Sequence, residues 1–186
     1  TASGAYSLFN NTSATSTVAI GYGSAQGLAD YSNQGGTYLG YQSGFSADTG
    51  SDYNTFLGYS SGYGVTTGAR NILLGQSTIN DSQNQVTTGN NNIAIGNDVA
   101  VASPTANNQL NIGNLIYGTG LDGTGATVST GNIGIGTSSP ASTFTVVGSA
   151  CISQGTGATA PCSTTAGTIT ATVFNTANAD LAEIYP

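Results

Sequence analysis

The chain has almost no basic residues and contains no histidine, lysine, methionine or tryptophan. Its 186 residues include one basic residue, Arg70, against eight carboxylates, for a formal net charge of −7. Without histidine or lysine, the Ser-His, Cys-His and lysine-based nucleophile schemes are excluded, as are zinc sites built from cysteine and histidine. We therefore expect no catalysis from this chain.

The same scarcity of positive charge limits which partners the chain can bind. Nucleic-acid backbones and anionic membrane surfaces are bound by clusters of Lys and Arg, and this chain has none. No apolar run approaches the roughly 20 residues of a membrane span. We expect neither nucleic-acid binding nor membrane insertion by this segment. Because even position 1 lacks methionine, we also expect a processed piece of a longer product.

Cysteine is nearly absent as well. The two cysteines, Cys151 and Cys162, lie in a stretch rich in Gly, Ser and Thr. We predict a disulfide between them, because the composition is otherwise typical of an extracellular protein. Such a bond typically stabilises by about 2–4 kcal/mol. The alternative is a pair of free thiols.

What the chain does have is a repeated short apolar unit that ends on glycine. The glycines that close the units are 17 to 23 residues apart. A unit of this length cannot bury its own apolar face, so it must stack on copies of itself. The seven instances are Val18-Ala19-Ile20-Gly21, Thr37-Tyr38-Leu39-Gly40, Thr55-Phe56-Leu57-Gly58, Ile72-Leu73-Leu74-Gly75, Ile93-Ala94-Ile95-Gly96, Leu110-Asn111-Ile112-Gly113 and Ile133-Gly134-Ile135-Gly136.

Odd and even positions differ within each unit. The first and third residues are mostly aliphatic, whereas the middle residue varies from alanine through tyrosine to asparagine. This is strand alternation, and we interpret it as a constant inner face and a variable outer face that contacts solvent. Glycine after each strand permits a positive φ and a tight corner. The pattern predicts an all-β fold, a repetitive parallel β-roll or β-solenoid.

Tyrosine recurs just after three of these corners, at Tyr22, Tyr41 and Tyr59. Successive coils would place the three rings above one another, and Phe45 and Tyr63 repeat at a second shared offset. One interpretation is an aromatic strip that binds a glycan or another polymer. The other is a structural ladder, which any stacked solenoid produces and which adds roughly 1 kcal/mol per ring pair.

The few acidic residues raise the question of calcium. Loops at 48–54, 80–84 and 97–98 combine carboxylates with amide and backbone oxygens, so Asp48, Asp52 and Asp98 are candidate ligands. Their spacing does not match an EF-hand. Asp48 and Asp52 are also the nearest carboxylate pair for glycoside hydrolysis, which keeps a polysaccharide-acting enzyme as an alternative. The simplest interpretation is that both solvate a loop.

The repeats divide the chain into three parts. We predict a β-roll over residues 1–117, a Gly/Thr-rich linker or neck over 118–131, and a small C-terminal β element with the disulfide loop over 132–186.

Two of the repeated strings resemble known families. Val18-Ala19-Ile20-Gly21 and Ile93-Ala94-Ile95-Gly96 are similar to the head repeats of trimeric autotransporter adhesins, although the repeats here are longer. Residues 131–140 resemble the neck that precedes the endosialidase-type chaperone domain of phage tail fibres. The resemblance implies a parallel β-roll that assembles as a homotrimer, with the inner strand faces forming a shared core. No protease residue carries over.

These observations lead to an expected function. We expect an extracellular structural or adhesive fibre segment, on a cell surface or virion, with itself and a host-cell surface or glycan as partners. One alternative is a receptor-binding segment of a phage tail fibre. Another is the subunit of a head-to-tail extracellular filament.

Overall fold

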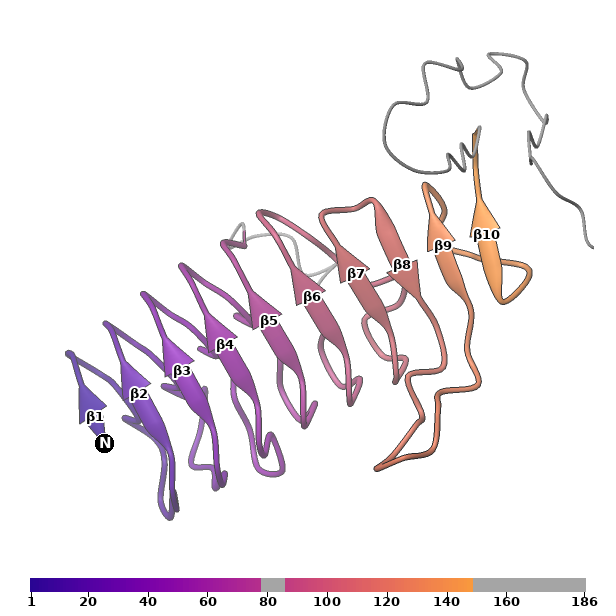
Figure 1. Ribbon diagram of the computed structural model, residues 1–186. Coiled ribbons are helices and arrows are strands. Elements are labelled where there is room, and N and C mark those ends of the chain that lie inside the picture. Colours follow the sequence, from indigo (N-terminus) through magenta and orange to yellow (C-terminus); the bar gives the residue numbers. More distant parts are fainter. Residues whose placement is uncertain (78–85, 149–186) are drawn as a thin grey trace, which may run out of the picture. The chain divides into compact units, whose positions relative to one another are not determined.

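The computed structural model describes residues 1–77 and 86–148 (Figure 1). The predicted Cys151–Cys162 disulfide lies outside the described residues, as do the loop at 80–84 and most of the predicted C-terminal β element. Within the described residues the chain forms strands and turns and no helix. The all-β prediction is confirmed.

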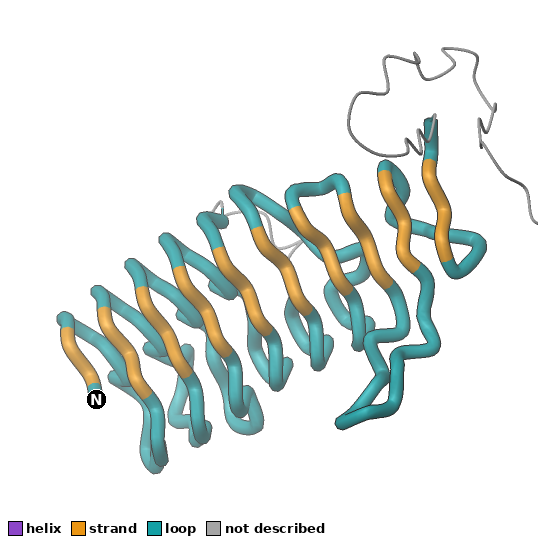
Figure 2. The backbone as a smooth tube through the Cα atoms, viewed as in Figure 1, coloured by secondary structure: helices purple, strands orange, loops and turns teal. Residues whose placement is uncertain are grey.

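Ten short strands form one sheet, in which they follow one another in chain order. Neighbours from β1 to β7 are parallel. Figure 2 shows the strands as one wall, with loops closing each coil behind it, and this is the predicted parallel β-solenoid. The strands are β1 (Ala2–Ser3), β2 (Val18–Ile20), β3 (Thr37–Leu39), β4 (Thr55–Leu57), β5 (Ile72–Leu74), β6 (Ile93–Ile95), β7 (Leu110–Ile112), β8 (Ile116–Gly118), β9 (Ile133–Ile135) and β10 (Phe144–Val146).

The corner glycines do more than permit a turn. Gly40 has φ 140° and Gly58 has φ 132°, a backbone region that residues other than glycine rarely adopt. A Cβ atom on Gly40 would also overlap the carbonyl group of Gly58 in the next coil. Gly21, Gly40, Gly58 and Gly75 therefore stack backbone against backbone, which explains why the strands from β2 to β5 each end on glycine.

The interior of the coils lies on the opposite side of the strands from the one predicted. The middle residue of each strand from β2 to β7 is buried: Ala19 and Tyr38 are 0% exposed and Phe56 is 1% exposed. The first and third residues point outward. Our assignment of the variable residue to the presented surface was wrong, because strand alternation defines two faces without showing which one the chain's own loops cover.

A column of amides runs through this interior beside the strands. The backbone N–H of Asn71 donates to Oδ1 of Asn54 at 2.9 Å, and that of Asn92 donates to Oδ1 of Asn71 at 2.9 Å. Gln109 continues the column, since its N–H donates to Oδ1 of Asn92 at 2.9 Å. Each Asn side chain also donates to a backbone carbonyl, at Gly68 for Asn54. The buried amides are thus satisfied by the stacking of coils.

The parallel run ends at β7. A hairpin turn through Gly113 and Asn114 reverses the chain, so that β8 is antiparallel to both β7 and β9. The loop between β8 and β9 is held by Thr130, whose N–H and hydroxyl donate to Asp122 at 2.7 and 2.6 Å. These bonds hold the pKa of the Asp122 carboxyl below its usual value. The predicted neck at 118–131 therefore joins two strands of one sheet, and the compact unit extends over Thr1–Val147.

Candidate functional surfaces

The outward side of the strand wall is an apolar surface, which we call the sheet face. It consists of the first and third residues of strands β2 to β10. Ile20 is 41% exposed, Leu39 42% and Leu57 46%. Apart from Thr37, Thr55 and Gly118, every position on it is aliphatic or aromatic, and none is charged.

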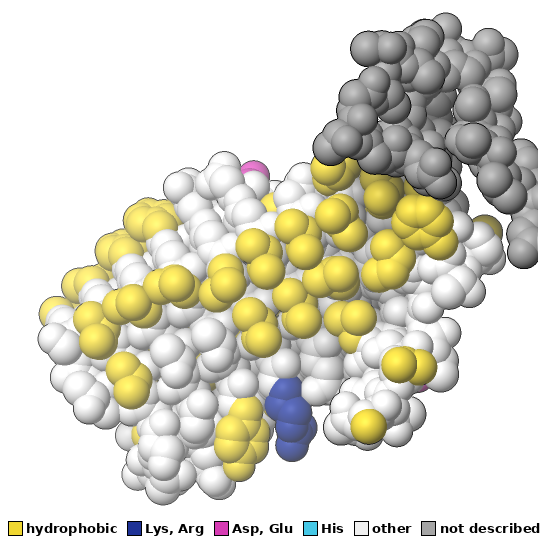
Figure 3. Space-filling model, in the orientation of Figure 1, with side chains coloured by type: hydrophobic (Ala, Val, Ile, Leu, Met, Phe, Trp, Pro, Cys, Tyr) yellow, Lys and Arg dark blue, Asp and Glu magenta, His cyan; other side chains and the backbone are white. Residues whose placement is uncertain are grey.

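The sheet face continues across the reversal at β8. Pairing places Ile112 opposite Ile116, Ile116 opposite Ile135, and Ile135 opposite Val146. Because directly paired residues point to the same side of a sheet, the apolar surface survives the change of chain direction. Figure 3 shows it as a hydrophobic band that crosses the strands. Continuous exposed apolar surfaces of this kind mark interaction sites.

A second surface lies at the carboxyl ends of the strands and consists of Tyr22, Tyr41 and Tyr59. We call it the tyrosine column. Tyr22 and Tyr41 stack with ring centroids 5.6 Å apart and an interplanar angle of 12°, and Tyr41 and Tyr59 stack at 5.0 Å and 10°. The structure thus brings the three predicted residues together. All three are more than 40% exposed.

The stacking limits what the tyrosine column can bind. The face of each ring is turned toward the next ring, so ring edges and hydroxyl groups are what solvent reaches. Tyr6 closes the amino-terminal end by packing edge-on against Tyr22, at 5.5 Å and 77°. Phe45 and Tyr63 form the second predicted pair, stacked at 4.9 Å and 2°. A ligand of the column would be contacted through hydrogen bonds and ring edges.

The candidate calcium ligands do not converge. Asp48 and Asp52 lie in one loop, whereas Asp98 follows β6. The Asp48 carboxylate accepts the N–H of Thr49 at 2.6 Å, and that of Asp52 accepts the N–H of Gln34 at 2.8 Å. Within residues 1–77 and 86–148, no three acidic, His or Cys side chains form a group that could hold a metal ion. In this part of the chain the two carboxylates accept hydrogen bonds from the backbone of loops.

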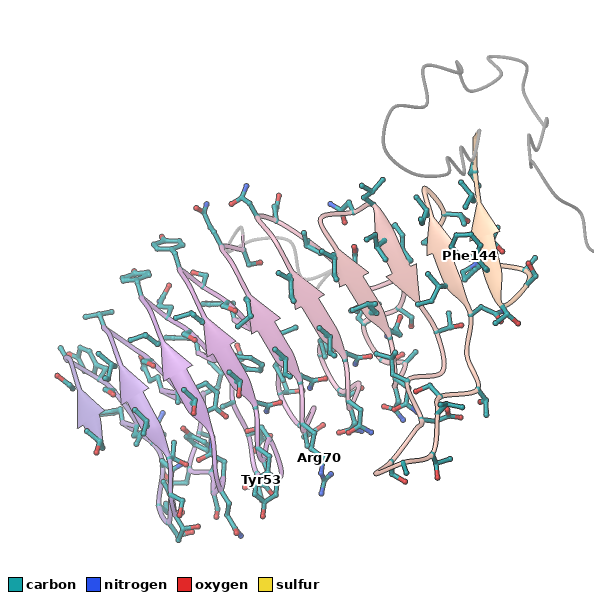
Figure 4. The ribbon with its side chains drawn as sticks, in the orientation of Figure 1. Tyr53, Arg70 and Phe144 are labelled. Carbon is teal, nitrogen blue, oxygen red and sulfur yellow. The ribbon has the colours of Figure 1, made fainter. Side chains whose placement is uncertain are left out.

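The corners just before β4 and β5 carry a contact between two side chains that the sequence analysis did not predict. Two residues before β4 and β5, Tyr53 and Arg70 both have φ 57°. Their side chains lie together, with the Arg70 guanidinium carbon 5.6 Å from the Tyr53 ring centroid (Figure 4). This is a cation–π contact of the only basic residue. The signal that could have shown it is the fixed offset of both residues from the strand.

Two further tyrosines are buried, and their role is structural. The Tyr38 hydroxyl accepts from Nδ2 of Asn33 at 3.0 Å and donates to the carbonyl of Ser51 at 3.2 Å. Burial raises the pKa of Tyr38, and it raises the pKa of Tyr31 to about 12. These phenols remain protonated donors inside the coils.

No helix among the described residues is long and apolar enough to cross a membrane. Comparisons of the chain with protein-family models, with curated proteins and with solved structures give no match. Function is therefore inferred from the sheet face, the tyrosine column and the corner pair of Tyr53 and Arg70.

Proposed function

We propose that this chain is an extracellular structural fibre segment whose copies associate side by side through the sheet face, as a homotrimer, and present their outer corners for attachment. The observation that supports this most strongly is the continuous uncharged apolar band over β2 to β10. Burial of apolar surface contributes roughly 25 cal/mol per Å². A band of half-exposed Ile, Leu and Val therefore favours association with an equally apolar partner.

A second copy of the chain is the partner that fits best. Every copy carries the same flat band with the same strand spacing, and the band has no charge that a different partner would have to match. We propose three chains per assembly because the repeats resemble the heads of trimeric adhesins. Three narrow rolls around one axis would cover all three bands.

A head-to-tail filament would join copies at the edge strands β1 and β10. β10 runs in the same direction as β7, because β8 is antiparallel to both β7 and β9 and β10 is parallel to β9. Pairing at these edges would leave the apolar sheet face exposed, whereas side-by-side assembly covers it, so we favour side-by-side assembly.

Attachment is the second half of the proposal. The outer corners carry the tyrosine column and the pair of Tyr53 and Arg70, all away from the sheet face. These aromatic and hydroxyl groups suit a glycan or a host-cell surface, as in an adhesin or in a receptor-binding segment of a phage tail fibre. Direct binding to a glycan array, compared between the wild type and Tyr53→Ala, tests this half separately.

The decisive experiment is light scattering coupled to size exclusion. We expect the wild-type chain to elute as a trimer and Leu57→Asp, which places a charge in the middle of the sheet face, to elute as a monomer. Thr67→Asp is the matched control, since it adds the same charge at an exposed loop position. A wild-type monomer would contradict the proposal, and a wild-type dimer would contradict its stoichiometry.

A further inference from the structure

The tyrosine column has a chemical property that goes beyond attachment. It holds three phenols of one chain in contact, with centroid separations of 5.6 and 5.0 Å between successive rings. The spacing is set by the strands, because parallel neighbours lie about 4.8 Å apart. The ring edges, which carry the reactive carbons beside the hydroxyl, are open to solvent.

No other tyrosine of the described residues has this combination of exposure and stacked phenol neighbours. Tyr31 and Tyr38 are buried, and Tyr6, which is 49% exposed, contacts Tyr22 edge-on at 77° and is not stacked on it. Tyr53 is 51% exposed, but its ring neighbour is Arg70. Tyr63 stacks on Phe45, which has no phenol group. Exposed, parallel phenols in contact therefore occur at one place, the tyrosine column.

We propose that the tyrosine column is a site of oxidative cross-linking, in which dityrosine bonds join successive coils of one chain. The oxidant is a peroxidase-type enzyme with hydrogen peroxide. Each of two neighbouring phenols loses one electron and one proton, and the two radicals couple through a new carbon–carbon bond between the positions beside their hydroxyls. The hydrogen on each coupled ring carbon then transfers to the oxygen of the same ring as the rings re-aromatise, which restores both phenols. The peroxide takes up the two electrons and two protons and leaves as two molecules of water.

The geometry determines which bonds form. Tyr41 has a stacked tyrosine on each side, whereas Tyr22 and Tyr59 are separated by Tyr41. The bonds are therefore Tyr22–Tyr41 or Tyr41–Tyr59, and not Tyr22–Tyr59. Either bond would link two coils covalently at the corner where the glycines stack. The site is separate from the sheet face, so cross-linking within a chain does not depend on assembly.

The test treats the full chain with a haem peroxidase and hydrogen peroxide and maps peptides by mass spectrometry. Cleavage before aspartate is suited to this, because Asp30, Asp48 and Asp52 place Tyr22, Tyr41 and Tyr59 on three separate peptides. We expect joined peptides two hydrogens lighter than their sum, with the cross-link assigned by fragmentation to Tyr41 and one neighbour. On a denaturing gel the product should migrate as a single chain.

Two variants make the outcome decisive. Tyr41→Phe keeps a ring in the stack but removes the central phenol, so we expect it to abolish the intrachain cross-links of the column. Tyr53→Phe removes an exposed tyrosine outside the column and should leave them unchanged. Cross-links that form only between chains, or intrachain links between the three column peptides that persist in Tyr41→Phe, would overturn the proposal, as would the absence of such links from the oxidised wild type.

Discussion

Two regions of the solenoid share one backbone geometry but fill the interior with different side chains. In the aromatic coils, β3 and β4, the interior is filled by Tyr38 and Phe56, whose rings meet edge-on at 5.4 Å and 74°. In the asparagine coils, β5 to β7, smaller middle residues lie beside the buried amide column, whose first member, Asn54, belongs to the coil of β4. What the two regions share is the strand register and the corner glycines.

The comparison shows that the backbone geometry, rather than one kind of core, defines the coil. Gly36 shows how an aromatic ring can take the place of an amide side chain in a coil. It occupies the position that Asn54 and Asn71 hold in later coils, and a Cβ there would strike the Tyr38 ring. Glycine at this position makes room for the ring, and the Tyr38 hydroxyl supplies hydrogen bonds in place of an amide.

The largest expected effect comes from the corner that both regions share. Gly40→Ala forces a side chain into φ 140° and against the Gly58 carbonyl, so we expect a loss of more than about 3 kcal/mol in the free energy of unfolding, measured by urea titration. The control Gly125→Ala has φ 58° and no atom within 4 Å of the new Cβ, and should cost about 1 kcal/mol. Equal losses would show that the close stacking of coils is not what selects glycine.

A cavity in the aromatic coils should have the next largest effect. Phe56→Ala removes a ring that is 1% exposed, and we expect a loss of roughly 3–5 kcal/mol. Tyr59→Ala removes an exposed ring of the tyrosine column and should cost about 1 kcal/mol. If both variants lost the same amount in thermal and urea unfolding, the aromatic interior would not be the stabilising element of these coils.

The matching perturbation of the asparagine coils is Asn71→Ala. It removes the acceptor of the Asn92 N–H and the donor to the Gly89 carbonyl, leaving both backbone groups buried without a partner. We expect a loss of roughly 2–4 kcal/mol from the two unsatisfied groups. Asn107→Ala, at an exposed corner where the side-chain Oδ1 accepts hydrogen bonds from Asn90, is the matched control and should cost less than about 1 kcal/mol. Hydrogen exchange on both variants would contradict this account if the amide of Asn92 stayed equally protected.

The smallest expected effect is a loss of stability at alkaline pH, which should begin around the buried tyrosines. The pKa of Tyr31 is raised to about 12 and that of Tyr38 is also raised, against an unfolded value near 10. A raised folded pKa stabilises fully below about pH 10 and loses this contribution as the pH rises toward the folded value. We expect urea stability to fall between about pH 10 and 12, with hydrogen exchange rising first around Tyr31 and Tyr38. Tyr38→Phe should weaken this dependence, and an unchanged dependence in both Tyr38→Phe and Tyr31→Phe would refute it.

Much of the fold could be predicted because each repeat is a short pattern of consecutive residues. The positions of the strands, the glycine corners and the stacking of Tyr22, Tyr41 and Tyr59 follow from spacing alone. The amide column could have been found in the same way, since Asn54, Asn71 and Asn92 each stand just before a strand. Tyr53 and Arg70 also share an offset from their strands, so the spacing could have placed them in neighbouring coils, but it does not reveal the left-handed backbone from which their side chains meet.

What the sequence alone determined is the repeating unit, and with it the parallel stacking and the identity of its corners. The glycines that end β2 to β5 are required by a local backbone angle and by the coil next to each of them, and both recur with the repeat. Which strand face lies inside was decided only by tertiary structure. The loops that close each coil cover the middle residues, bury Ala19, Tyr38 and Phe56, and leave Ile20, Leu39 and Leu57 outside. Alternation with a period of two is symmetric between the two faces, and only the path of the closing loops breaks that symmetry.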